Sequence, residues 1–360
     1  MASSRPIFVL SIDGGGILGI IPLKILEHIE KEAGKPIAEL FDLITGVSTG
    51  GIIALGLTMP SRPYAAPSLG CRRAFYSAKN MSEIYKTRAC DIFKKTSFGR
   101  FCDMTRVTSL LYALFFSQYQ EKGAEALFKE VLGDTPFSHA VTRVLILAYN
   151  LQRSLHKGPR LKLFRSYPKP LKQPCYHHIG PKEITFLMKD VARATSSVPT
   201  FFPAKYMHYR SKTNVSCETG YFVDGAVVVN DPALFAFLEA RRLFPDSEIF
   251  ILSLGIGKSG NYDAVMKSAS PGILTWKKDF FRLIVDPHAE SHRSLLRKLI
   301  KNSKKSTSYC RIESKKLPNT LRFDDSSPKT IETLNAIGEA LVQEEKETLR
   351  VFLELLKKKN

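Results

Sequence analysis

A serine flanked by glycines is the first feature of the sequence that suggests chemistry. Residues 46–50 read Gly-Val-Ser-Thr-Gly, the G-x-S-x-G spacing that would expose Ser48 on a sharp strand-to-helix turn. Upstream, Asp13 is followed by three glycines at 14–16. The backbone N–H groups of such a loop can hold a developing oxyanion. The two segments therefore predict a nucleophile and an oxyanion hole, and they leave the general base to be identified.

The elements around these segments favour an α/β fold. Residues 7–12 form an apolar run typical of a buried strand, and apolar residues recur with helical spacing over 20–33. Residues 41–45 predict a second strand, and residues 51–59 predict an apolar helix directly after the serine. Because strand, turn and helix alternate, we expect a three-layer α/β/α sandwich with a mostly parallel central sheet.

The rest of the chain continues this alternation less regularly. The proline-rich residues 60–75 and 159–181 predict exposed loops. The remaining predicted elements are strands at 144–149, 221–225 and 249–255, a pair of helices within 107–131, a helix at 184–194 and an amphipathic helical stretch at 331–357.

Composition restricts the class of protein. With 360 residues, 44% of them hydrophobic, the chain could form one large α/β domain or two smaller ones. Six scattered cysteines without a Cys-x-x-Cys pair argue against zinc ribbons and disulfide-stapled secreted domains. We find no run of about 18 apolar residues and no secretory leader pattern in residues 1–13. We therefore expect a cytoplasmic protein that is peripheral on membranes; non-Sec export as an effector is also compatible.

The net charge of +19 favours polyanionic partners. We expect peripheral contact with an anionic membrane surface. The sequence has no basic motifs interleaved with aromatic residues, so no specific nucleic-acid partner is expected. Residues 157–172 form one lysine-rich candidate for membrane docking. The densest basic run supplies the other candidates, which are Arg293, Arg297, Lys298, Lys301, Lys304 and Lys305.

Two alternatives use other combinations of residues. Gly14, Gly16 and Gly19 match the dinucleotide-binding fingerprint, but that function requires an acidic residue at the end of the second strand, where the serine turn stands instead. A Ser-His-Asp esterase could use His288 or His292 as its base, although both lie in a polar helical stretch with no strand before it. These histidines lack the H-E-x-x-H pattern, so no metal site is predicted.

Three motifs in a fixed order resemble one known family. They are Asp13-Gly14-Gly15-Gly16 with Gly19, Gly46-Val47-Ser48-Thr49-Gly50, and Val223-Asp224-Gly225. Residues 194–197, 202–203, 230–233 and 253–257 support them. The whole resembles the patatin-like phospholipases closely over residues 7–257 and more faintly over 309–341. The resemblance implies a patatin-like catalytic domain over residues 1–320 and a C-terminal helical extension over 321–360 that packs on the same domain.

The resemblance also implies the roles of individual residues. Ser48 would be the nucleophile and Asp224 the base, with no histidine, metal or organic cofactor. A carboxylate with a pKa of about 3.9 is a poor base for an alcohol, so the site must raise the pKa of Asp224. The oxyanion hole would be formed by Gly14, Gly15 and Gly16, while Gly46, Gly50, Gly19 and Gly225 are the elbow and motif glycines.

One position departs from the family pattern. The family usually has Arg or Lys at the second position after the glycine triplet, and this chain has Leu18 there. The departure puts the head-group preference in doubt without removing the oxyanion donors, which are backbone groups.

The sequence thus predicts a lipid acyl hydrolase of the phospholipase A type that works through an acyl-enzyme. The implied substrates are phospholipids or other glycerolipids, and an unknown activating ligand or protein is compatible with the many basic residues. The alternatives are the Ser-His-Asp esterase and a non-catalytic lipid- or polyanion-binding protein on a hydrolase scaffold.

Overall fold

One mixed β-sheet forms the centre of the molecule. The structure is a computed structural model, and it describes residues 5–61, 73–94, 117–152, 160–167, 186–210, 217–257, 280–303, 305–315, 317–318 and 321–357. The strands are β1 (Ile7–Ile12), β2 (Leu43–Val47), β3 (Arg143–Asn150), β4 (Arg160–Arg165), β5 (Lys205–Arg210), β6 (Cys217–Asp224), β7 (Ile249–Leu254) and β8 (Thr307–Ile312). Their order is β5-β6-β3-β2-β1-β7-β8, and β4 also pairs with β3.

The larger part of this sheet is parallel. Strands β3, β2, β1, β7 and β8 all run in the same direction, whereas β4 and β6 are antiparallel to β3, and β5 is antiparallel to β6. The expectation of a mostly parallel sheet is therefore confirmed for the described residues.

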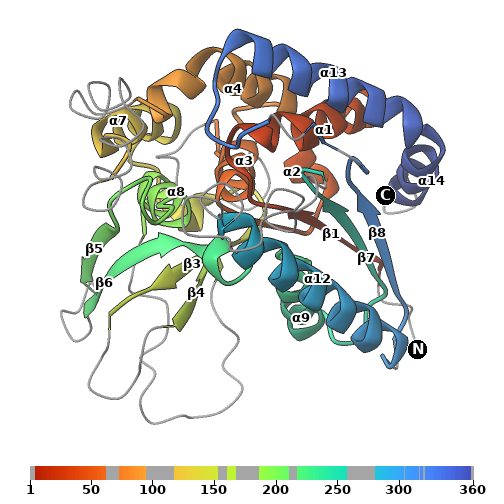
Figure 1. Cartoon of the computed structure of the whole chain (residues 1–360). Helices are drawn as coiled ribbons and strands as arrows, with labels where there is room; N and C mark the ends of the chain where they lie inside the picture. Colours follow the sequence, from red (N-terminus) through yellow and green to blue (C-terminus); the bar gives the residue numbers. More distant parts are fainter. Residues whose placement is uncertain are drawn as a thin grey trace, which may run out of the picture.

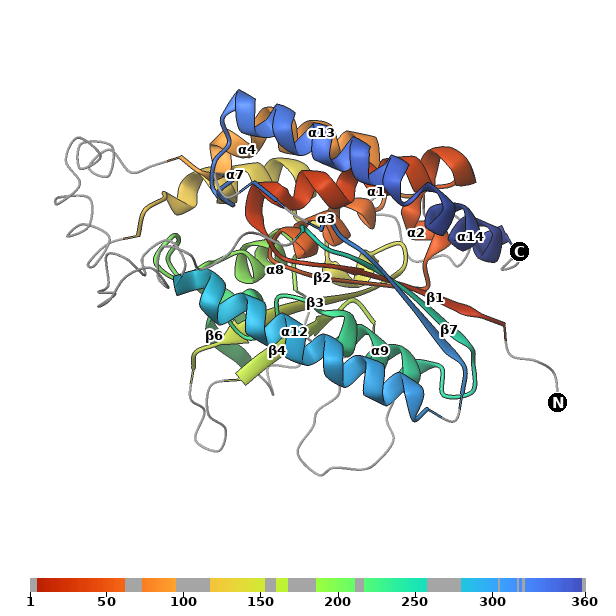
Figure 2. The same cartoon turned by 45° about the vertical axis from the view of Figure 1, so that its right-hand side comes forward.

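Helices cover both faces of the sheet, as Figures 1 and 2 show. One face carries α1 (Ile20–Ala33), α2 (Ile37–Leu40), α3 (Thr49–Leu57), α4 (Ala78–Ile92), α7 (Glu121–Leu132), α8 (Met188–Thr195), α13 (Pro328–Glu344) and α14 (Lys346–Lys357). The other face carries α9 (Ala233–Leu243) and α12 (Phe280–Lys301). Three short 3-10 turns, η1 (Gly16–Gly19), η2 (Phe137–His139) and η3 (Gly225–Val227), complete the described elements. This arrangement is the predicted three-layer sandwich.

The uninterrupted apolar run of β1 is explained by burial on both faces. Phe8, Leu10 and Ile12 belong to the core under α1, whereas Ile7 and Val9 belong to the core under α9 and α12. A strand covered on both sides by helices buries every side chain, so it does not show the alternation of a half-exposed strand. The same physical reason made this segment easy to predict.

Strand β3 brings the ends of two other strands together. Residues 143–147 pair with β2, and residues 148–150 pair with β6. Because β4 pairs with residues 145–150 along one edge, β2 and β6 must share the other edge. They run in opposite directions along it, so the carboxyl end of β2 at Val47 meets the carboxyl end of β6 at Asp224.

Several elements differ from the sequence-based expectation. Residues 160–165, expected in an exposed loop, form strand β4, and residues 168–185 lie outside the described residues. The helix predicted at 184–194 begins at Met188. Of the helix pair predicted within 107–131, the structure describes α7, while residues 95–116 lie outside the described residues.

The C-terminal helices lie against the first helix of the chain. The single stretch predicted at 331–357 is two helices, α13 and α14, which meet at Glu345. A Cβ atom on Gly338 of α13 would lie 2.7 Å from Cγ of Lys24 in α1, so the two helices approach closely. From α14, the Phe352 ring stacks on Phe41 and packs edge-on against Phe8.

Candidate active site

Ser48 occupies a strained turn between β2 and α3. Its backbone dihedrals, φ 53° and ψ −127°, lie in a region that L-residues other than glycine rarely adopt. The side chain is 6% exposed. The Ser48 N–H donates a hydrogen bond of 2.9 Å to Oγ1 of Thr195. The strand, sharp turn and helix predicted around this serine are therefore present.

The motif glycines are sites of close backbone approach. A Cβ on Gly46 would lie 2.2 Å from the carbonyl oxygen of Gly50, and a Cβ on Gly50 would lie 2.2 Å from that of Ile12. Gly225 packs in the same way against the Leu147 carbonyl oxygen. These distances leave no room for a side chain.

The glycine loop after β1 lies directly beside the serine. A Cβ on Gly14 would lie 3.1 Å from Cβ of Ser48. The Gly14 N–H, however, donates to the carbonyl oxygen of Asn230 at 3.1 Å. Gly14 is therefore not a free oxyanion donor, which corrects the expectation that all three glycines supply one. Its role is to allow the loop to approach Ser48.

Two glycine N–H groups remain available in this loop. Among the described residues, neither Gly15 N–H nor Gly16 N–H has a hydrogen-bond acceptor. Gly16 has a positive φ of 58°, and a Cβ there would lie 2.1 Å from the Phe323 carbonyl oxygen. That carbonyl accepts a 2.8 Å hydrogen bond from Ile17 N–H. The segment around Phe323 thus fixes the far side of the loop.

The first residue of α3 supplies another donor that the sequence analysis did not name. Thr49 follows the serine and begins the helix, so its N–H has no intrahelical acceptor. In a nucleophile elbow, the N–H after the nucleophile is an oxyanion donor. The partial positive charge of the helix N-terminus adds to this effect. The G-x-S-x-G spacing itself was the signal that could have identified it.

Asp224 is the buried carboxyl group of the site. It ends β6, is 0% exposed, and its Oδ1 accepts a 2.8 Å hydrogen bond from Ala226 N–H. Its Oδ2 has no partner of regular hydrogen-bond geometry among the described residues, although the Ser48 hydroxyl lies near enough to act on its pKa. Burial raises the pKa of Asp224 to about 7, against smaller lowering effects of the Ser48 hydroxyl and the Ala226 N–H. The structure thus brings the two predicted dyad residues together.

Asp13, which precedes the glycine loop, is held by Arg311 of β8, whose side chain is 10% exposed. Arg311 donates to both carboxylate oxygens of Asp13 and, at 2.8 Å, to Oγ of Ser253. Arg311 also pairs with Glu313 and lies 3.4 Å from Asp231. The loop is therefore anchored by an ion cluster that joins β1, β7 and β8. No local sequence signal marks this cluster, because Arg311 lies 298 residues from Asp13.

Leu18 lies in the apolar core. It is 7% exposed and packs with the residues under α1. The neighbouring motif glycine, Gly19, packs against Thr49, whose Oγ1 would lie 2.6 Å from a Cβ at position 19. An apolar side chain thus fills the position at which the family usually carries a cation.

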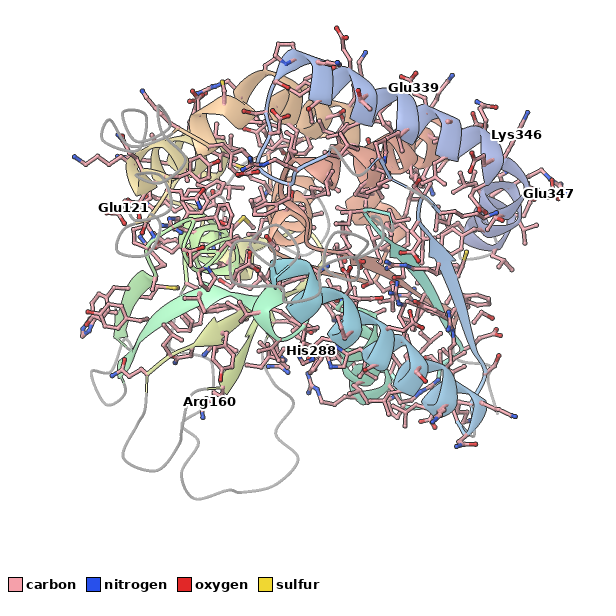
Figure 3. All side chains as sticks on the ribbon, in the orientation of Figure 1. Glu121, Arg160, His288, Glu339, Lys346 and Glu347 are labelled. Atoms are coloured by element: carbon pink, nitrogen blue, oxygen red, sulfur yellow. The ribbon has the colours of Figure 1, made fainter. Side chains whose placement is uncertain are left out.

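Neither candidate histidine contacts Ser48 within the described part of the chain. His288 is exposed on α12 (Figure 3), and its ring lies 6.4 Å from that of His292. His292 packs edge-on against Phe235 of α9, and its Nδ1 has no hydrogen-bond partner. Burial, with a smaller effect of His288, lowers the pKa of His292. The structure therefore does not assemble a Ser-His pair from these residues.

The basic run on α12 divides into buried and exposed residues. Arg293 is 9% exposed and pairs with Glu290 and Glu313, so it is not a membrane-docking residue, contrary to expectation. The exposed members are Arg297, Lys298, Lys301 and Lys305; Lys304, residues 157–159 and residues 168–172 lie outside the described residues.

The exposed members of this run lie near the amino ends of the parallel strands, whereas Ser48 lies at their carboxyl ends. After α12 the chain enters β8, where Thr307 pairs with Ile249 at the amino end of β7. Ser48, by contrast, follows the carboxyl end of β2. Lys301 and Lys305 therefore lie near the amino ends of the parallel strands, away from the candidate site.

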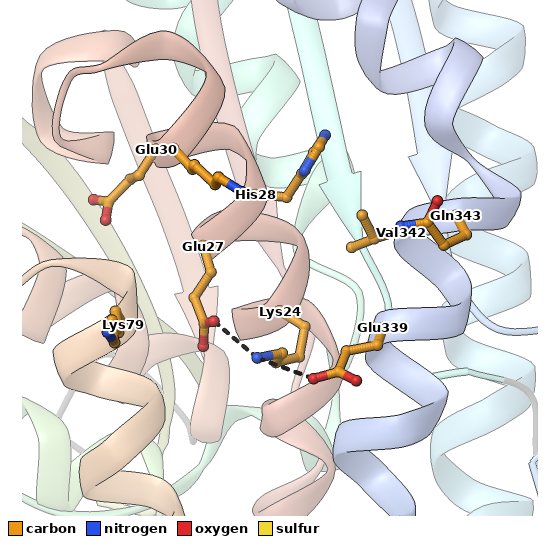
Figure 4. Close-up of a pocket in the computed structure, with 9 residues that line it drawn as sticks. Lys24, Glu27, His28, Glu30, Lys79, Glu339, Val342 and Gln343 are labelled. Atoms are coloured by element: carbon orange, nitrogen blue, oxygen red, sulfur yellow. Dashed lines mark hydrogen bonds and ion pairs between the residues drawn. The ribbon is translucent and has the colours of Figure 1, made fainter.

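Other surface features do not extend the site. A groove between α1, α4 and α13 is lined by charged side chains, and Figure 4 shows Lys24 between Glu27 and Glu339. None of its lining residues belongs to the Ser48 site. Among the described residues, no group of three His, Cys, Asp or Glu side chains could hold a metal ion. None of the described helices combines the length and apolar character needed to cross a bilayer.

Comparison with known proteins matches the chain to one family model and to several individual proteins. The family model described as patatin-like phospholipase matches residues 10–237. Patatin-like protein 2 of Oryza sativa subsp. indica is 28% identical over 385 residues, which cover 97% of this chain and 86% of that protein. Patatin-03 of Solanum tuberosum is 28% identical over 97% of this chain and 88% of its own length. The solved structure of human GIVD cytosolic phospholipase A2 aligns with a TM-score of 0.48 and 10% identity, covering 99% of this chain and 60% of that one.

Proposed function

The chain belongs to the patatin-like phospholipase family, and we propose that it is a lipid acyl hydrolase of the phospholipase A type. It cleaves fatty-acyl esters of membrane glycerolipids with Ser48 as nucleophile and Asp224 as base. The observation that carries this proposal is the junction of β2 and β6 on one edge of β3. There a strained serine directly follows β2 and a fully buried carboxyl group ends β6, and the two strands run toward each other.

The reaction proceeds in two acyl transfers. The Ser48 hydroxyl oxygen attacks the ester carbonyl carbon, and Asp224 accepts the hydroxyl proton. When the tetrahedral intermediate collapses, the carbon–oxygen bond to the leaving alcohol breaks and Asp224 returns the proton to that alcohol. Water then attacks the acyl-serine ester, again giving its proton to Asp224, and the fatty acid leaves as Ser48 is re-protonated. Every proton is accounted for by one carboxyl group.

The raised pKa of Asp224 makes this base competent. A general base is most effective when its pKa lies near the working pH. With a pKa of about 7, Asp224 is a far stronger base than an exposed aspartate and is still substantially ionised at neutral pH. Since the cause is burial, an apolar acyl chain in the site would strengthen the same effect.

The oxyanion is stabilised by backbone donors. Gly15 N–H and Gly16 N–H come from the loop after β1, and Thr49 N–H comes from the first turn of α3. These donors are fixed before substrate binds, so they need no reorganisation during the reaction. Their backbone origin also explains why Leu18 can replace a cation without loss of this function.

The substrate places the enzyme at a membrane surface. Because the Ser48 site lies at the carboxyl ends of the parallel strands, this end of the sheet must face the lipid during turnover. The exposed basic residues at the end of α12 lie near the amino ends of these strands, so we assign them no part in the docking that delivers substrate. Among the described residues, we find no feature that favours either the histidine-dependent esterase or the non-catalytic scaffold over the dyad.

Fatty-acid release from mixed phospholipid vesicles tests the proposal. The wild-type protein should release fatty acid, Ser48→Ala should release none above background, and His292→Gln should match the wild type. Circular dichroism of each variant controls for folding. Full activity in folded Ser48→Ala, or loss of activity in folded His292→Gln, would refute the dyad.

A further inference from the structure

The end of α8 contacts both members of the proposed dyad. Thr195, the last residue of the helix, accepts the 2.9 Å hydrogen bond from Ser48 N–H. Two residues later, the carbonyl oxygen of Ser197 accepts a 2.9 Å hydrogen bond from Asp224 N–H. Three segments that are far apart in the sequence therefore meet at Thr195–Ser197, and each dyad residue is attached to it by its own backbone N–H.

The hydroxyl of Thr195 is fully committed to this arrangement. Thr195 is 0% exposed, and its Oγ1 donates a 2.5 Å hydrogen bond to the carbonyl oxygen of Leu147. A hydroxyl has one proton to donate, so Oγ1 faces Ser48 N–H with its lone pairs. Leu147 pairs with Val47, the residue before Ser48. One side-chain oxygen thus connects β3 to the backbone of the serine.

The strain at Ser48 gives this contact its importance. A serine with φ 53° keeps that conformation only if its surroundings constrain it from several sides. The next turn of α3 provides one constraint, because Ile52 N–H donates to the Ser48 carbonyl oxygen at 3.1 Å. Thr195 provides the constraint on the N–H. Without it, the peptide before Ser48 is free to rotate toward a relaxed conformation.

A buried arginine fixes the other end of the same segment. Arg193 is 1% exposed and hydrogen-bonds to Oγ of Ser197 and, at 3.0 Å, to the carbonyl oxygen of Pro203. Its guanidinium also lies 5.2 Å from the centre of the Phe202 ring. These contacts hold the loop that leaves α8, so Thr195 and Ser197 present their oxygens from a rigid support.

We propose that Thr195 is a positioning residue that holds the nucleophile in its reactive conformation through a single side-chain hydrogen bond. It does not touch the substrate; it acts through the backbone of Ser48. The proposal rests on the proposed function, in which Ser48 is the nucleophile. It assigns a role in acyl transfer to the hydroxyl of Thr195 rather than to its size.

Two substitutions separate the hydroxyl from the size of the side chain. Thr195→Val keeps the shape and removes the oxygen, whereas Thr195→Ser keeps the oxygen and removes a methyl group. A buried hydrogen bond that is left unmade costs enough to change a rate by about tenfold to a hundredfold. We expect kcat for fatty-acid release to fall by about that factor in Thr195→Val with KM unchanged. Thr195→Ser should stay within about threefold of the wild type.

Labelling of Ser48 by a fluorophosphonate provides a readout independent of lipid binding. The labelling rate should fall in Thr195→Val and not in Thr195→Ser, while both keep a cooperative melting transition. If Thr195→Val does not fold, Thr195→Ala replaces it, since it removes the same oxygen without adding bulk.

The possible outcomes are distinct. Wild-type kcat and labelling in folded Thr195→Val would overturn the role of Thr195 and leave the proposed function intact. Equal losses in the Val and Ser variants would assign the effect to packing and also overturn it. Full activity in Ser48→Ala would instead contradict the proposed function itself.

Discussion

Replacing Asp224 by asparagine should strongly reduce activity and stabilise the protein at the same time. The side chain is fully buried, and burial raises its pKa from 3.8 to about 7. A carboxyl group with a raised folded-state pKa favours folding below its unfolded pKa of 3.8, and this contribution is lost as the pH rises through about 7. The raised pKa of Asp224 therefore destabilises the folded protein by an amount that grows as the pH rises above 3.8 and is largest above about 7.

The size of this destabilisation follows from the shift in the pKa of Asp224. At ~1.4 kcal/mol per pKa unit, the raised pKa of Asp224 costs the folded protein about 4 kcal/mol at pH 8, where the carboxyl group is ionised, and about 2 kcal/mol at pH 5.5, where it must take up a proton on folding. Asparagine carries no charge and its oxygen can still accept from Ala226 N–H, so it avoids this cost. We expect the stability advantage of Asp224→Asn to be about 2 kcal/mol larger at pH 8 than at pH 5.5. Asp13, whose pKa burial also raises, is present in both proteins and cancels in the difference.

Denaturant unfolding of both proteins at the two pH values measures this difference directly. Fatty-acid release by Asp224→Asn should be lower by a factor of about 10² to 10⁴ at either pH, the contribution of a general base. An advantage that does not change with pH would show that the carboxyl group is not desolvated. An active, folded Asp224→Asn protein would refute its role as base.

Four further outcomes follow from the same structure. The kcat/KM of the wild type should rise with pH through an apparent pKa near 7, because Asp224 must be ionised; a flat profile between pH 5.5 and 8 would contradict this. Ser48→Gly should be about 1 kcal/mol more stable than Ser48→Ala in thermal unfolding, since only glycine relieves the positive φ, and equal stability would argue against strain. Arg311→Met should cost about 3–5 kcal/mol in denaturant unfolding by leaving Asp13 unpaired, and adding Asp13→Asn should recover part of the loss; no recovery would exclude this pairing as the cause. His292→Gln should keep wild-type turnover, and a large loss would revive the histidine-dependent esterase.

The parts of the site that the sequence predicted are those with local signals. The G-x-S-x-G spacing marks the turn at Ser48, and the apolar segments on either side mark β2 and α3, because these features depend only on neighbouring residues. The layered α/β fold followed from the same local pattern. Asp224 required the family resemblance, since nothing near it in the sequence distinguishes a catalytic aspartate from a turn residue.

The parts that were missed depend on contacts between distant residues. The Gly14 N–H is removed from the oxyanion donors because the carbonyl oxygen of Asn230 accepts its hydrogen bond, and Asp13 is held by hydrogen bonds that Arg311 donates. Thr195 lies in a stretch that the resemblance included, but only its position beside Ser48 gives it a role. Strand β4 was missed because a short basic strand is stabilised by pairing with β3 rather than by its own composition.

The docking residues show a different kind of error. A run of basic residues in the sequence does not reveal which side chains face inward. Arg293 faces inward and forms ion pairs with Glu290 and Glu313. Nor does the run reveal whether it ends near the amino ends or the carboxyl ends of the parallel strands. Both properties depend on the phase and direction of α12, which the three-dimensional structure supplies.

Trapping of the acyl-enzyme tests the central claim most directly. The protein is mixed with excess phospholipid, quenched in acid during turnover, and analysed by intact and peptide-level mass spectrometry. The proposed mechanism predicts one fatty-acyl group per chain, attached to Ser48, with none in Ser48→Ala. Fatty-acid release without any acyl-protein, or an acyl group on another residue, would contradict it.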